Sequence, residues 1–272
     1  MNNKPFFSIV IANYNHGEFL EDAIKSILNQ NFYDFELIIV DGGSKDNSIN
    51  IIKSYEEKIS WWVSEPDTGQ SEAFNKGFRE ASGQYFFWVN ADDILLPNSL
   101  TKAYELIKKK NAKWLAANTI FFDENKIIKK CTVGPKWNKF LIKYGPIYVY
   151  GPTSIFHRDL FFTVGGFDEN LKFTMDGDLW MKFVNKSYSF IRSKDFFWGF
   201  RIHSKSKTSH AFKNQPVEKF FLERRITQEK NNHTNLKSVT YLQSIYKLFN
   251  GCYLKSFYYT SILKGKSIDV VK

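Results

Sequence analysis

Cysteine is scarce in this sequence. Its 272 residues include only Cys131 and Cys252, which lie far apart along the chain. This scarcity argues against a disulfide-stapled scaffold and against a thiolate metal site. It also fits a reducing compartment.

Long apolar runs are missing as well. No stretch approaches the roughly 20 consecutive apolar residues that a bilayer-spanning helix needs. The apolar run at residues 6–12 follows a single lysine and has no small-residue cleavage site, so it is unlike a secretory signal. We therefore expect a cytoplasmic protein, and we leave open a peripheral contact with the inner face of the membrane.

Glycine-rich phosphate-binding motifs are also absent. No Gly-x-Gly-x-x-Gly follows the first predicted strand, and no phosphate loop ends in Gly-Lys-Ser or Gly-Lys-Thr. A dinucleotide oxidoreductase and a phosphate-loop ATPase are therefore poor interpretations. A diphosphate bound without such a cradle needs a cation, which adjacent carboxylates such as Asp92 and Asp93 could hold.

The positive charge of the chain is concentrated at one end. The net charge is +10; residues 201–272 contain 14 Lys and Arg against 4 Asp and Glu, whereas residues 1–200 contain 24 of each. No nucleic-acid-binding motif accompanies this charge, so we expect no nucleic-acid partner. Two alternatives remain: helices that pack on the rest of the protein, or peripheral contact of residues 216–272 with an anionic membrane.

The apolar residues that are present predict an α/β fold. They make up 43% of the sequence, enough for a proper core. Predicted strands at residues 6–12, 35–40, 59–63 and 85–89 alternate with polar loops and helices, which is typical of a mostly parallel sheet flanked by helices. The loops after parallel strands meet at one edge. Polar side chains expected to converge there are Asn13, Tyr14, Asp41, Asp67, Asp92 and Asp93.

The stretch QYFFWVNADD at residues 84–93 is the centre of this pattern. A buried strand ends abruptly at Asp92 and Asp93, which is suitable for holding a cation. Alternatively, Asp93 caps a helix at residues 98–110. This stretch alone favours neither the metal site nor the helix cap.

The second half of the sequence is less regular. Residues 114–122 and 126–133 predict a hairpin, and residues 153–157 a short strand before a helix at 159–164. A helix with Leu179 and Trp180 on its apolar face follows, and the last strand is expected at residues 196–202. From residue 216 onward the sequence predicts helices.

Seven motifs in order resemble those of the family 2 glycosyltransferases, inverting enzymes with the GT-A fold. They are SIVIANYNHGEFL, IIVDGGSKDNS, SEPDTGQSEAFNKG, WVNADD, GGFDE, TMDGDLW and FRIHSKS. The resemblance covers residues 8–209. It implies a GT-A catalytic domain at 1–215, with a donor half at 1–110 and an acceptor half at 111–215, followed by a basic helical C-terminal extension at 216–272.

The resemblance also implies roles for individual residues. Asp176 matches the general base, and Asp93 and His203 match ligands of Mn²⁺ or Mg²⁺. Asp178 is the alternative base. His203 could instead be an ordinary histidine at the end of a strand, and Asp176 or Asp178 could merely cap the helix before Leu179. The positions that match the nucleotide-sugar donor site are Ala12, Asn13, Tyr14, Asp41, Asp67, Gln70, Asn75 and Asp92.

Three departures from the family pattern stand out. Asn90-Ala91-Asp92-Asp93 replaces a strict Asp-x-Asp, which leaves open whether Asp92 or Asp93 is the main metal ligand. Phe74 stands where many relatives have an arginine, and Met175 where they have the first acid of a Glu-Asp pair. An Arg–phosphate contact is therefore not expected here.

The expected function is transfer of a sugar from a nucleotide diphosphate sugar, with UDP favoured, to a hydroxyl of a glycan or lipid-linked glycan. The setting implied by the resemblance is bacterial surface polysaccharide or glycolipid biosynthesis. One alternative is a sugar nucleotidyltransferase. Such an enzyme usually has a glycine-rich loop with a lysine or arginine that binds the triphosphate, and residues 13–17 do not form such a loop. The other is a non-catalytic carbohydrate-binding protein that stacks sugars on tryptophans such as Trp88 and Trp180.

Overall fold

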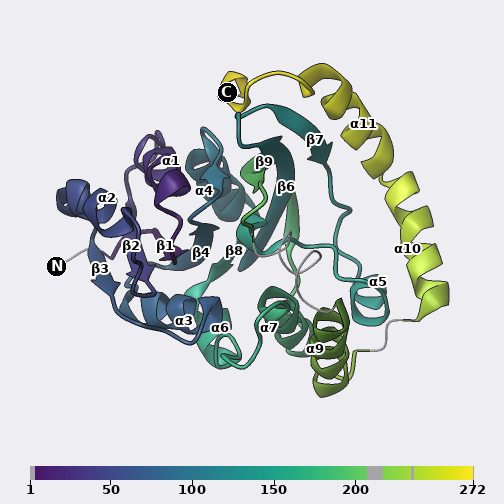
Figure 1. Ribbon diagram of the computed structural model, residues 1–272. Helices are drawn as coiled ribbons and strands as arrows, with labels where there is room; N and C mark the ends of the chain where they lie inside the picture. Colours follow the sequence, from purple (N-terminus) through teal and green to yellow (C-terminus); the bar gives the residue numbers. More distant parts are fainter. Residues whose placement is uncertain (1–3, 207–216, 234–235, 272) are drawn as a thin grey trace.

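The structure of the protein is a computed structural model, shown in Figure 1, that describes residues 4–206, 217–233 and 236–271. A single twisted sheet runs through the centre, and helices pack on its two faces. The expected domain boundary between residues 215 and 216 and the end of the family resemblance at residue 209 lie outside the described residues.

The first four strands closely match the predicted ones and pair with one another in parallel. They are β1 (Phe7–Asn13), β2 (Phe35–Asp41), β3 (Trp61–Ser64) and β4 (Tyr85–Asn90). The helical segments between and after them are α1 (Gly17–Leu28), α2 (Ser48–Ser54), η1 (Glu56–Lys58), α3 (Gln70–Glu80) and α4 (Ser99–Lys110). The strands are apolar on both faces because helices cover both faces of the sheet.

The second half of the chain extends this sheet with mixed pairing. Its strands are β6 (Trp114–Asp123), β7 (Ile128–Thr132), β8 (Ser154–His157) and β9 (Ile191–Ile202). β6 and β7 form the predicted antiparallel hairpin, and β8 lies antiparallel between β4 and β6. β9 begins earlier than predicted, because Ile191 and Arg192 already pair with β6. The register of this pairing shifts before the predicted part of the strand begins.

A short strand rather than a helix cap follows the two acids. Ile94–Leu95 forms β5, which pairs antiparallel with β9. Helix α4 begins only at Ser99, with Asn98 as its N-cap residue in a left-handed conformation (φ 62°). The interpretation of Asp93 as the cap of this helix is therefore wrong. Within the described ranges, the strand order is β3-β2-β1-β4-β8-β6-β9-β5, with β7 paired to β6.

Buried aromatic rings fill the space between the sheet and the helices of the second half. Trp180 stacks on Trp88 and Trp114, with ring centroids 5.9 and 5.2 Å apart. All three rings are buried, so Trp88 and Trp180 serve the core and are not available to stack on a sugar. The helical segments here are α5 (Lys139–Tyr144), η2 (Gly151–Thr153), α6 (Arg158–Thr163) and α7 (Met175–Asn185).

The C-terminal region is helical, as predicted. It contains α9 (Val217–Lys230), α10 (Lys237–Phe249), α11 (Cys252–Leu263) and η3 (Ile268–Val270). Figure 1 shows α9 beside α7, whereas α10 and α11 run along the outer side of the molecule. α10 contacts α5, and α11 contacts β7, so these helices extend the protein body rather than forming a detached unit.

Candidate functional site

The ends of β1 and β2 are joined by a buried polar network around Asp41. The Asp41 carboxylate accepts hydrogen bonds from Asn13 Nδ2 (2.6 Å), Ser64 Oγ (2.7 Å) and the backbone N–H of Ser44 (2.8 Å). Asp41 is fully buried, whereas the Tyr14 side chain is 60% exposed. The structure therefore brings together Asn13 and Asp41 as predicted, and Asp41 fixes the loop that contains Gly43 and Ser44. Ala12 is half-buried one residue before Asn13.

Asp67, in the loop after β3, lies against the loop that follows β2. A Cβ atom at Gly42 would come within 2.8 Å of Asp67 Oδ2, so glycine lets the two loops approach closely without displacing the Asp67 side chain. Burial raises the pKa of Asp67 above its ordinary value, and the nearby carboxylates of Glu72 and Asp41 raise it further. Asp67 thus adds negative charge next to the loop 41–44.

A chain of hydrogen bonds links α3 to the end of β4 and on to β9. Gln70 Nε2 donates to Asn90 Oδ1 (3.0 Å), and Asn90 Nδ2 donates to Asp93 Oδ2 (2.8 Å). The backbone N–H of Arg201 donates to Asp93 Oδ1 (2.8 Å). Asp93 is buried, and burial followed by the adjacent Asp92 charge raises its pKa well above the ordinary value. Its geometry is that of a residue that holds two strands together.

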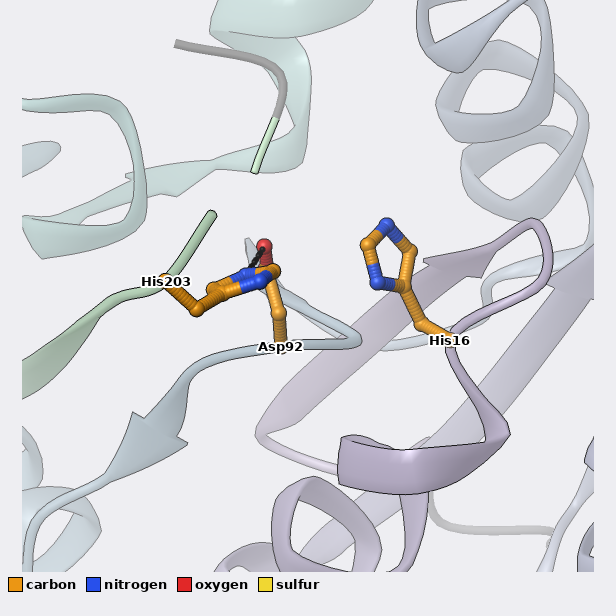
Figure 2. A group of neighbouring side chains, drawn as sticks. All are labelled: His16, Asp92 and His203. Atoms are coloured by element: carbon orange, nitrogen blue, oxygen red, sulfur yellow. Dashed lines mark hydrogen bonds and ion pairs between the residues drawn. The ribbon is translucent and has the colours of Figure 1, made fainter. Parts of the chain in front are cut away.

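Asp92, rather than Asp93, faces His203. Asp92 Oδ2 lies 2.9 Å from His203 Nε2, and the ring of His16 lies across from this pair, as Figure 2 shows. One potential ligand atom from each residue lies within 4.8 Å of the others. His203 is buried, and its Nδ1 atom has no hydrogen-bond partner among the described residues. A carboxylate oxygen and two imidazole nitrogens at this spacing can hold a divalent cation.

The sequence analysis did not predict two residues at this site, His16 and Arg201. His16 lies in the loop after β1, at the same edge of the sheet as Asp92. Its place directly after a predicted strand was the one feature of the sequence that could have suggested it. Arg201 donates from Nε to the Asp92 carbonyl oxygen (2.8 Å) and pairs with Asp22 Oδ2 (2.9 Å). Its guanidinium lies 4.7 Å from the ring centroids of Phe19 and Phe122. Arg201 thereby holds the turn that carries Asp92.

Asn75 holds a neighbouring turn rather than joining this cluster. Its side chain donates to the Phe167 carbonyl oxygen and to Glu169 Oε1, both at 2.9 Å, and accepts from the Phe167 N–H at 3.0 Å. Asn75 therefore fixes the GGFDE motif on α3. Both the oxygen and the nitrogen of the Asn75 amide are used by this turn.

Asp176 lies in the first turn of α7 and lines a cavity of about 260 Å³. A Cβ atom at Gly151 would lie 2.4 Å from Trp88 Cζ2 and 3.3 Å from Asp176 Oδ2. Gly151 therefore packs against both Asp176 and the side chain of Trp88, which belongs to the strand that ends at Asn90. Residues lining the cavity include Tyr150, Phe173, Thr174, Asp176, Phe220, Arg224 and Gln228.

Asp178, the alternative base, is committed to internal contacts. It is fully buried, accepts from Asn231 Nδ2 (2.7 Å) and forms an ion pair with Lys182 Nζ (2.7 Å). These partners leave it a structural role at the contact of α7 with α9. Asp176 is the half-buried acid of the two.

Comparisons with known proteins identify a common family. The family model described as "Glycosyl transferase family 2" matches residues 8–163. An uncharacterized glycosyltransferase of Rickettsia typhi is 32% identical over 196 residues, which cover 68% of this chain and 60% of that protein. The chain therefore spans less than two thirds of the length of this relative.

Two solved structures share the fold. S. aureus TarS 1-349 in complex with UDP-GlcNAc matches with a TM-score of 0.69 and 18% identity, over 92% of this chain and 76% of that one. The mannosyltransferase PcManGT from Pyrobaculum calidifontis, in complex with GDP-Man and Mn²⁺, matches with a TM-score of 0.63 and 15% identity, over 96% of this chain and 76% of that one. At these identities the likeness shows the fold alone.

Proposed function

The chain belongs to glycosyl transferase family 2 and has the GT-A fold, and we propose that it moves a sugar from a nucleotide diphosphate sugar to an acceptor hydroxyl with inversion. The observation that supports this proposal is that β4 is near both acidic groups. Asp92 follows the end of β4 and lies beside His203, and Asp176 lines a cavity and packs against Gly151, which also contacts Trp88 of β4. A donor bound at the edge can therefore present its sugar to an acceptor in the cavity.

The donor site of this proposal lies along the loops after β1, β2 and β3. Tyr14 is exposed enough to cover a base, and Asp67 and Gln70 are half-buried at the edge. Ala12, Asn13 and Asp41 shape the floor. A UDP-sugar is the expected donor, in line with the UDP-GlcNAc held by TarS, and the GDP-Man held by PcManGT makes GDP the alternative.

The metal ligands that we propose are Asp92 and His203, with His16 as a third. The short Asp92–His203 contact and the spacing of ligand atoms from His16, Asp92 and His203 within 4.8 Å fit a cation site, whereas Asp93 is occupied by Asn90 and Arg201. Asp92 thus takes the ligand role that the sequence assigned to Asp93. Imidazole nitrogens favour Mn²⁺ over Mg²⁺, which prefers oxygen ligands. When bound, the ion offsets the negative charge that develops on the leaving diphosphate.

Asp176 is the proposed general base. It lines the cavity in which the acceptor hydroxyl would lie, opposite the diphosphate, and would take the proton of that hydroxyl as the new glycosidic bond forms. A positioned base contributes about 10²–10⁴-fold to the rate. We expect Asp176→Asn to lose transfer by that factor and to retain donor binding measured by calorimetry.

The matched control for this experiment is Asp178→Asn, two residues later in the same helix. It removes the charge that pairs with Lys182. We expect it to lower thermal stability while its folded fraction still transfers sugar. Normal turnover by Asp176→Asn would overturn the assignment of the base.

The acceptor that we propose is a glycan or lipid-linked glycan of bacterial surface polysaccharide or glycolipid biosynthesis, reached at a membrane surface. None of the helices in the described ranges is both long and apolar enough to cross a bilayer. Instead, α10 and α11 expose apolar side chains opposite their buried faces, for example Tyr241, Leu248 and Phe249 on α10 and Leu254 and Phe257 on α11.

The outer face of α10 and α11 is positively charged, which favours binding to an anionic surface. Lys237, Lys255, Lys264 and Lys266 are exposed, and none forms an ion pair with a described residue. Among residues 236–271 the one acid is Asp269. An apolar face flanked by lysines matches the interface of an anionic lipid bilayer, so we propose peripheral binding of α10 and α11 there.

A further inference from the structure

Helix α9, which lies beyond the part of the chain that matches the family model, closes the N-terminus of the helix that carries Asp176. Glu223 Oε1 accepts hydrogen bonds from the backbone N–H groups of Phe173 (2.6 Å) and Thr174 (2.8 Å), and Oε2 accepts from that of Lys172 (2.9 Å). A carboxylate here satisfies N–H groups beside the start of α7 and opposes the positive end of its dipole. α9 is therefore attached directly to the segment that carries Asp176.

Two more residues at four-residue spacing complete this attachment. Thr227 Oγ1 lies 2.9 Å from Thr174 Oγ1, and Asn231 Nδ2 donates to Asp178 Oδ1 at 2.7 Å. Residues four apart lie on one side of a helix, so these contacts fix the rotation of α9. A second row with the same spacing, formed by Phe220, Arg224 and Gln228, consequently faces the cavity that Asp176 lines.

Arg224 is the unusual member of that row. It is half-buried, and its guanidinium forms no ion pair with any residue in the described ranges. The next residue, Arg225, is exposed and pairs with Glu229 at 2.9 Å. His233 also lines the cavity, but burial lowers its pKa, so it is neutral near pH 7. Among the described lining residues, Arg224 is thus the permanently charged cation.

We propose that the acceptor carries an anionic group, a phosphate or a carboxylate, which Arg224 binds in the cavity beside Asp176. This inference rests on the proposed function and adds the chemical class of the acceptor. A guanidinium binds both oxyanions through paired charge-assisted hydrogen bonds. Tyr150 and Phe173 supply apolar surface for a sugar ring in the same cavity.

The test compares matched probes with the donor site filled by UDP and Mn²⁺. Glycerol 1-phosphate is compared with glycerol, and glucuronate with glucose, by calorimetry or ligand-observed NMR. We expect one of the anionic probes to bind about tenfold to a hundredfold more tightly than its neutral partner, the effect of one charged hydrogen-bonded contact. The phosphate and carboxylate arms identify which oxyanion the acceptor carries.

The variants decide whether Arg224 is responsible. Arg224→Gln should lose the preference for the anionic probe, Arg224→Lys should keep part of it, and the control Arg225→Gln should keep all of it. Equal binding of neutral and anionic probes to the native protein, or an undiminished preference in Arg224→Gln, would overturn the proposal. Failure of the proposed function would instead appear as absent binding of UDP and absent donor turnover in the native protein.

Discussion

At the scale of single residues, Asp92 and Asp93 are neighbours with opposite environments. The chain turns after Asn90, where the Asp93 N–H donates to the Asn90 carbonyl oxygen (3.1 Å), so strand alternation no longer decides which acid is buried. The sequence therefore predicted an acidic pair at the sheet edge but not which acid faces His203. His16 escaped prediction for a similar reason, since only the folded loop brings it toward the pair.

We predict that Asp92→Asn and Asp93→Ala fail in different ways. Asp92→Asn should weaken Mn²⁺-dependent UDP binding at least about tenfold, because a charged ligand is lost, with little change in stability. Asp93→Ala, which leaves the Arg201 N–H without its partner, should lower the free energy of unfolding by about 1–3 kcal/mol. Calorimetry with and without Mn²⁺, and denaturant unfolding, measure the two effects. The reverse pattern would restore Asp93 as the ligand.

The raised pKa of Asp67 predicts a stability that depends on pH. Its folded-state pKa lies above the unfolded value, so the ionised form costs stability at neutral pH and this cost disappears as the pH falls below the unfolded pKa. We expect Asp67→Asn to raise the melting temperature at pH 7 and to leave it unchanged at about pH 3. Equal shifts at both pH values would mean that the charge of Asp67 is not the cause.

At the scale of elements, the strands were predictable and the placement of α9 was not. Buried β1, β2 and β4 are short apolar runs bounded by polar loops, a pattern that sequence analysis detects directly. β5 has two residues, too few to show a pattern. Three polar residues fix α9 in place: Glu223, Thr227 and Asn231. The packing face of α9 therefore has no apolar stripe from which the sequence could have predicted it.

The attachment of α9 predicts a catalytic effect at a distance from the reacting atoms. Glu223→Ala removes the acceptor for three N–H groups beside the start of α7, those of Lys172, Phe173 and Thr174. We expect a loss of about 0.5–2 kcal/mol in stability, as for a lost helix cap, and a lower kcat with unchanged donor KM, because Asp176 loses its fixed position. Steady-state kinetics check this, and Glu229→Ala on the exposed side of α9 is the control. An unchanged kcat in Glu223→Ala would exclude the positioning role.

At the scale of the whole molecule, the sheet edge with Asp92, the cavity lined by Asp176 and the outer helices α10 and α11 form one body. The hydrogen bonds of α10 to the α5 region, including Gln243 Nε2 to the Pro146 carbonyl oxygen (2.7 Å), connect the apolar outer face to the segment that precedes the cavity lining. A protein lying on a bilayer through α10 and α11 would therefore hold the cavity lined by Asp176 in a fixed position relative to the lipid.

Vesicle binding tests this arrangement. We expect the native protein to cosediment with vesicles containing anionic lipid and much less with neutral vesicles or at high salt. Phe249→Gln with Phe257→Gln removes two side chains that are 84% and 75% exposed and should lower the binding, whereas Tyr33→Gln, at an 85% exposed site outside these helices, should not. If the double variant instead abolishes a dimer seen in sedimentation, and vesicles bind neither protein, the outer face joins two copies.

The most direct measurement of the central claim is a crystal structure with Mn²⁺ and the nucleotide sugar that stabilises the protein best in a thermal-shift panel. The account predicts an ion held by Asp92 and His203, and an anomeric carbon turned toward the Asp176 carboxylate with room for one acceptor hydroxyl between them. An ion held elsewhere, or a sugar directed away from Asp176, would contradict it.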